Sequence, residues 1–121
     1  MAVTIDDVRA LASGLPRSYE VVVRGRVKFR VGQIVYLAFS RDETLMGFAF
    51  PKQEREAALE TYPDKFLRPE PSEMRFKWLV VRLDAIYADE LRELVFDAWR
   101  MVVPKKLSVL SDDELQQRPS S

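Results

Sequence analysis

The chain has 121 residues, of which 47% are hydrophobic and 31% are charged, and its 19 basic and 19 acidic side chains give a formal net charge of zero. This size and composition are typical of one globular domain, and they exclude a chain that is disordered throughout. The absence of cysteine and histidine excludes disulfides, thiolate nucleophiles, zinc–thiolate sites and catalytic triads that contain histidine. We therefore expect a protein that is not an enzyme, with no catalytic residue, no metal and no cofactor.

The neutral net charge also limits the partners that we expect. A protein that wraps DNA is normally basic, so a nucleic-acid role would need a local cationic patch. No stretch is long and apolar enough for a transmembrane helix, and the N-terminus lacks the basic-then-apolar layout of a secretion signal. We expect a cytoplasmic monomer with no membrane partner, and with nucleic acid or another protein as the candidate ligand.

The first half of the chain begins with a helix and continues with strands. Residues 4–15 have helical periodicity, with Val8 and Leu11 on the apolar face and Pro16 directly after. Gly32 suits the first central position of a tight hairpin turn. Short connections predict an antiparallel meander, since parallel strands need long crossovers. The strands that we expect span residues 19–24, 26–31, 34–40 and 44–50.

The second half alternates helices with one strong strand. We expect a helix at residues 53–62, a proline-bearing segment at 66–71, a strand at 74–83 and a helix at 89–102. Residues 1–108 would then form a single two-layer α+β domain, an antiparallel sheet with helices on one face. Residues 109–121 are polar and predict a C-terminal tail, mostly disordered, in which Ser111 could cap a short helical turn.

Alternation along the strands sorts their side chains into two faces. The apolar set, which we assign to the core, is Val27, Phe29, Val31, Val35, Leu37, Phe39, Met46, Phe48, Phe50, Leu79, Val81 and Leu83. The opposite set, which we assign to an open face, is Arg26, Lys28, Arg30, Tyr36, Ala38, Ser40, Leu45, Gly47, Ala49, Phe76, Trp78, Val80 and Arg82. The assignment depends on register, because a shift of one residue exchanges the two faces.

The open face combines cations with aromatic rings, which is what single-stranded nucleic acid requires: charge for the phosphates and rings on which bases stack. The alternative is that the cations form an ordinary solvated strand face. Trp78 could likewise be packed under a loop or the C-terminal tail, because tryptophan is highly buried on average. The candidate nucleic-acid-binding residues are Arg24, Arg26, Lys28, Arg30, Tyr36, Trp78 and Arg82.

Three stretches carry a resemblance to a known family. They are GRVKFRVG at residues 25–32, KWLVVRLD at 77–84, and the segment 91–107, which begins LREL and ends PKKL. In this order they resemble the MmcQ/YjbR-like proteins, over about residues 5–108. The resemblance implies a two-layer α+β fold with a layout similar to secretion chaperones. It also implies DNA binding, which is often ascribed to the family for its double-wing likeness to transcription-factor domains. Where the family commonly has a His-Pro pair, this chain has Arg26 and Val27.

Three functions remain open from the sequence. The leading hypothesis is a non-enzymatic module that binds nucleic acid through the cationic, aromatic-bearing sheet face. The second is a protein-interaction or chaperone-like domain, which predicts an exposed apolar patch. The third is a small-ligand protein, which predicts a concave cavity near Trp78 with a carboxylate or lysine of perturbed pKa.

Overall fold

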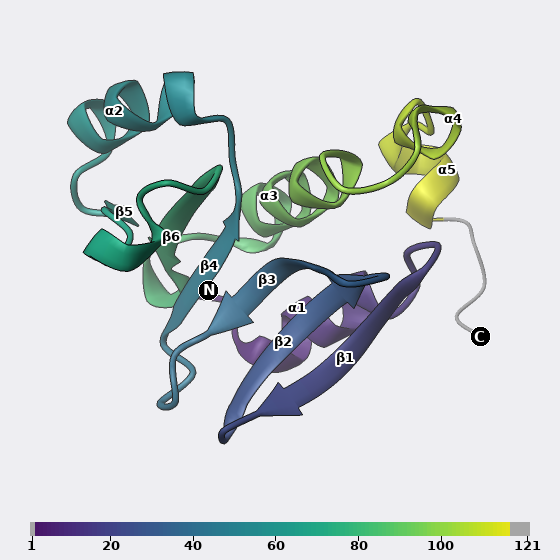
Figure 1. Ribbon diagram of the computed structural model, residues 1–121, viewed down its shortest axis with the longest axis horizontal. Helices are drawn as coiled ribbons and strands as arrows, with labels where there is room; N and C mark the ends of the chain where they lie inside the picture. Colours follow the sequence, from purple (N-terminus) through teal and green to yellow (C-terminus); the bar gives the residue numbers. More distant parts are fainter. Residues whose placement is uncertain (1, 117–121) are drawn as a thin grey trace.

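The computed structural model describes residues 2–116 as an α+β domain built on one antiparallel sheet (Figure 1). The strands are β1 (Ser18–Val23), β2 (Arg26–Val31), β3 (Ile34–Phe39), β4 (Leu45–Ala49), β5 (Phe66–Leu67) and β6 (Trp78–Arg82). The helices are α1 (Ile5–Ala12), α2 (Lys52–Thr61), α3 (Ala88–Arg100), α4 (Lys105–Ser108) and α5 (Asp112–Gln116), with 3-10 turns at Pro71–Glu73 and Leu83–Ala85. The six strands have the order β1-β2-β3-β4-β6-β5. The predicted fold class is confirmed.

The core lies between the sheet and the pair α1 and α3, which pack against each other. Helix α1 begins where the Thr4 backbone N–H donates a hydrogen bond to Asp7 Oδ2 at 2.8 Å. Helix α3 buries its apolar stripe, and Trp99 on that stripe is fully buried. The Trp99 indole N–H donates to the carbonyl oxygen of Pro16 at 2.9 Å, which satisfies its only polar group. Helix α2 lies apart from this pair, beside β5 and β6.

A β-bulge changes the predicted face assignment in β3. Lys28 pairs with Ala38, but Arg30 pairs with Val35, so Tyr36 is an extra residue between the two pairs. Val35 therefore lies on the open face with Arg30, and the Tyr36 ring lies in the core, fully buried. The sequence-based assignments of Val35 to the core and of Tyr36 to the open face are both wrong. Strict alternation fails because the extra residue changes, from that point in the strand, which side chains face the core and which face the open side.

The rest of the predicted core set follows the alternation. These residues are buried, except Phe50, which is partly buried beyond the end of β4. Tyr36 shares a hydrogen bond with the Ser18 hydroxyl. Burial raises the pKa of the Tyr36 phenol well above its usual value, and the Ser18 hydrogen bond opposes this only in part.

Residues 109–116, expected as part of a polar tail, instead pack on the domain. Ser111 Oγ accepts a hydrogen bond from the Glu114 backbone N–H, and the Glu114 side chain accepts one from the Ser111 N–H. This reciprocal cap starts α5, which places Leu115 at 3% exposure in the core. Arg100 donates to Asp112 Oδ1 at 2.7 Å and so ties α5 to α3. The remainder of the predicted tail, residues 117–121, lies outside the described residues.

The sheet splits at one end, between β3 and β4. These strands pair only from Leu37 opposite Phe48 to Phe39 opposite Met46. The first residues of β3 pair with β2 alone, while β4 continues along β6 as far as Ala49 opposite Trp78. Figure 1 shows the start of β3 turning away from the end of β4. The divergence leaves a hollow between two halves of one sheet.

Candidate binding groove

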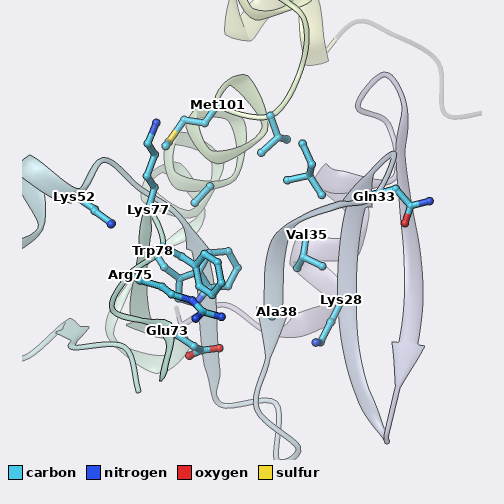
Figure 2. Close-up of a pocket in the computed structure, with 14 residues that line it drawn as sticks. Lys28, Gln33, Val35, Ala38, Lys52, Glu73, Arg75, Lys77, Trp78 and Met101 are labelled. Carbon is cyan, nitrogen blue, oxygen red and sulfur yellow. The ribbon is translucent and has the colours of Figure 1, made fainter. Parts of the chain in front are cut away.

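The hollow between β3 and β4 is a groove with a volume of about 750 Å³ (Figure 2). One wall comes from β2, β3 and their hairpin turn, the other from the segment before β6, and the end of α3 closes the space between them. The lining residues are Lys28, Gln33, Ile34, Val35, Ala38, Ala49, Lys52, Glu73, Arg75, Phe76, Lys77, Trp78, Met101 and Val102. The concavity thus gathers side chains that are more than seventy positions apart in the sequence, from Lys28 to Val102.

Trp78 forms the aromatic surface of the groove, and Gly47 makes room for it. A Cβ atom placed on Gly47 would lie 2.5 Å from Trp78 Nε1 and 2.8 Å from Cε2. Only glycine therefore lets the indole lie directly over β4. The ring is partly exposed in the middle of the groove (Figure 2). The alternative that Trp78 is packed under a loop or the C-terminal tail does not describe this arrangement within residues 2–116.

The polar lining of the groove is mostly cationic. Its basic members are Lys28, Lys52, Arg75 and Lys77, and its acidic member is Glu73. Within residues 2–116, none of these basic side chains forms an ion pair. The Arg75 guanidinium carbon lies 4.8 Å from the centre of the Phe76 ring, a cation–π contact that leaves its charge uncompensated. The groove therefore presents a local positive field in a protein with no net charge.

The segment that carries Arg75, Lys77 and Trp78 is fixed by strand pairing and by one buried side chain. The Phe50 backbone N–H donates to the Lys77 carbonyl oxygen at 2.9 Å, which extends the β4–β6 ladder by one step. On the other side, Arg55 of α2 donates hydrogen bonds to backbone carbonyls of this segment. One wall of the groove is β-sheet and the other is a segment held by these hydrogen bonds, which favours a preformed site.

The structure brings together only part of the predicted site. Lys28 and Trp78 line the groove on opposite walls. Arg26 and Arg30 flank Lys28 along β2, outside the lining, and the Arg26 Nε–H donates to the Phe39 carbonyl oxygen at 3.0 Å.

The other predicted site residues lie away from the groove. Arg24 is at the tip of the β1–β2 hairpin, with φ of 54°. Arg82 pairs with Leu45 at the far end of β6. Tyr36, expected as a stacking residue, is inside the core and cannot stack on a ligand.

Sequence reasoning missed the cations of the second wall. Arg75 and Lys77 alternate with Phe76 and Trp78, and this interleaving of basic and aromatic residues was a usable signal. Lys52 and Met101 had no such signal, because only the packing of α2 and α3 around the split sheet brings them to the groove.

The described residues contain neither a cluster of metal-ligating side chains nor a membrane-spanning helix. No group of three or more metal-ligating side chains occurs in residues 2–116. None of the helices in that range is long and apolar enough to cross a membrane.

Comparison with known proteins decides the family. The family model YjbR matches residues 13–101, which include both walls of the groove. The chain belongs to the YjbR family. The match confirms the family expected from the three sequence stretches, the first two of which lie inside the matched range. No curated protein matches the chain.

A solved structure supports the same fold for this YjbR domain. The crystal structure of the Deinococcus radiodurans protein DR2400, with a DUF419 domain, matches with a TM-score of 0.73 and 22% sequence identity. The match covers 98% of this chain and 91% of that one. At this identity the likeness shows that the two chains share a fold.

Proposed function

We propose that this YjbR domain is a non-enzymatic binding module for single-stranded nucleic acid, with the groove as the site for a base and its flanking phosphates. The observation that carries the proposal is the partly exposed Trp78 indole, surrounded by Lys28, Lys52, Arg75 and Lys77 without ion-pair partners among residues 2–116. Proteins that bind single strands combine a cationic groove with aromatic side chains on which bases stack. The groove offers one carboxylate, Glu73, in a chain without histidine or cysteine, which supports binding rather than catalysis.

The distribution of charge favours a polymer. Arg26 and Arg30 continue the row of Lys28 along the open face of β2, beyond the rim of the groove. A chain of phosphates can follow such a row while a base occupies the hollow. In a duplex the bases are paired and stacked on one another, so none could reach Trp78 without being flipped out. The site therefore fits a single strand better than a double helix.

The direct test is fluorescence anisotropy with labelled dT10 and a labelled duplex at two salt concentrations. If four cations neutralise phosphates, affinity for the single strand should fall about 50-fold between about 50 and about 200 mM salt. Lys77→Glu should weaken binding of dT10 strongly. Arg41→Glu, an equal charge change at an exposed cation outside the groove that forms no ion pair within residues 2–116, should not. Absence of binding at low salt, or equal losses in both variants, would contradict the proposal.

A second candidate function is supported by the size of the hollow. Its volume of about 750 Å³ lies within the range of small-molecule sites. Apolar residues such as Val35, Ala49 and Val102 line it beside the indole. A small planar anion would satisfy these features as well as one nucleotide does. The length of the ligand distinguishes the two functions. A polymer site should bind dT10 far more tightly than the mononucleotide dTMP, whereas the affinity of a small-anion site should not rise with added nucleotides.

A further inference from the structure

We infer that Arg55 is the positioning residue of the groove, a buried guanidinium that holds the segment 74–78 and thereby places Arg75, Lys77 and Trp78. The inference deepens the proposed function and rests on it only where ligand binding is measured. Arg55 does not line the groove itself. It lies on the opposite side of the wall, on α2, with 7% of its surface exposed.

Three hydrogen bonds connect Arg55 to this wall. Its Nη1 donates to the carbonyl oxygens of Phe76 and Trp78, each at 3.2 Å. Its Nη2 donates to the carbonyl oxygen of Met74 at 3.0 Å. A planar guanidinium with fixed donor directions thus holds every second carbonyl over five residues. The wall cannot move toward or away from the groove without breaking these bonds together.

The same segment has few other attachments to the rest of the described domain. On the β4 side, it is held by the Phe50 N–H bond to the Lys77 carbonyl and by pairing of Trp78 with Ala49. Before Lys77, the remaining backbone bonds are local, from Met74 to Pro71 and from Phe76 to Glu73. Arg55 is therefore the tertiary contact that orients the part of the wall carrying Arg75 and Phe76.

The charge of Arg55 also supports a role in the groove. Within residues 2–116 it forms no ion pair, although it is the one charged residue there that is buried. An uncompensated buried charge is costly, and its Nε–H has no hydrogen-bond partner in the described structure. Bound carbonyl oxygens offset part of that cost. The remaining positive charge lies directly behind the cationic wall and adds to the field that an anionic ligand meets.

The first experiment needs no ligand. The chain has two tryptophans, so two indole N–H signals are expected in a nitrogen–proton correlation spectrum, assigned with Trp78→Phe. Arg55→Met removes the charge and all three bonds at similar length, and Arg55→Lys keeps the charge but loses the planar fork. We expect the Trp78 indole signal to shift in Arg55→Met, and less in Arg55→Lys, while the Trp99 signal stays in place. Arg68→Met, which removes an exposed cation paired with Glu56, is the matched control and should move neither signal.

A purely structural role for Arg55 makes a different prediction. It would lower the melting temperature and leave the Trp78 signal of the folded variants unchanged, and that result overturns the inference. If Arg55→Met does not fold, the same comparison is made with Arg55→Lys, in which an unmoved Trp78 signal is again contradictory.

The second experiment measures binding of labelled dT10 at low salt. We expect Arg55→Met to weaken binding by about tenfold, the scale of losing one stacked base. Arg55→Lys should fall between wild type and Arg55→Met, and Arg68→Met should match wild type. Wild-type affinity in folded Arg55→Met would overturn the inference. If wild type itself does not bind dT10, the proposed function fails, and the indole signals still decide the role of Arg55.

Discussion

The basic residues on the two sides of the sheet differ in whether they have carboxylate partners. On the helix-covered side, basic residues of α1 and α3 have carboxylate partners: Arg9 pairs with Asp6 and Glu20, and Arg100 with Asp97 and Asp112. The basic residues of the groove have no such partner among residues 2–116. The chain has no net charge, yet the basic residues of its groove are not neutralised by carboxylates of residues 2–116. Charge balance over a whole chain says little about the field at one site.

The two tryptophans show the same contrast. Trp99 is fully buried under the sheet, and its indole N–H is bonded to the Pro16 carbonyl. Trp78 lies partly exposed over Gly47. One ring contributes mainly to stability, and the other is available to a ligand.

The largest expected effect comes from truncating each tryptophan in turn. Trp99→Ala should lower the free energy of unfolding by about 3–5 kcal/mol, because it leaves a large cavity and removes a buried hydrogen bond. Trp78→Ala should cost less than about 2 kcal/mol, since only part of its ring surface is removed from water, and should weaken binding of dT10 by at least about tenfold through the lost stacking. Urea denaturation and anisotropy measure the two effects. Equal destabilisation by both variants would contradict the assignment of Trp99 to the core and of Trp78 to a partly exposed position in the groove.

A smaller effect is expected at Gly47. Gly47→Ala places a methyl group against the Trp78 indole, so it should destabilise the fold by about 1–3 kcal/mol. The ring would be displaced into the groove and binding of dT10 weakened. In a Trp78→Ala background the clash is absent and the cost of Gly47→Ala should largely vanish. A double-mutant cycle by urea denaturation tests this, and additive losses would show that the close contact is not the cause.

The smallest effect concerns the bulge residue Tyr36. Its pKa is raised by burial from an ordinary value of 10.0, so the folded state retains a proton that the unfolded state releases. The stability linked to this proton is present below about pH 10 and is lost progressively as the pH rises above it. Tyr36→Phe should cost about 1 kcal/mol at neutral pH through the lost Ser18 bond. It should also reduce the alkaline loss of stability, measured by urea denaturation from pH 8 to 11. An alkaline loss as steep as that of wild type would contradict burial of Tyr36.

The sequence-based predictions succeeded where short-range periodicity carries the information. The strand residues Val27 and Phe29 alternate with Arg26 and Lys28, and the structure buries the first pair while the second stays on the open face. The prediction failed at Val35 and Tyr36, because a bulge depends on how β3 pairs with β2 rather than on its own residues.

The site was predictable only in part. Lys28 and Trp78 were placed on one face from alternation alone, and the structure puts both in the groove. No local pattern could show that β3 and β4 diverge, or that Lys52 and Met101 reach the hollow. The buried Arg55 was equally hidden, since an arginine in an amphipathic helix normally faces water.

The sequence by itself determined the α+β class, the family, most of the core and the absence of histidine and cysteine chemistry. These depend on composition, periodicity and short motifs, which act within a few residues of the chain. Tertiary structure alone decided where the sheet splits and which cations gather there without carboxylate partners among residues 2–116. Those features arise because strand pairing and helix packing bring distant residues together, and local sequence does not encode the distances between them.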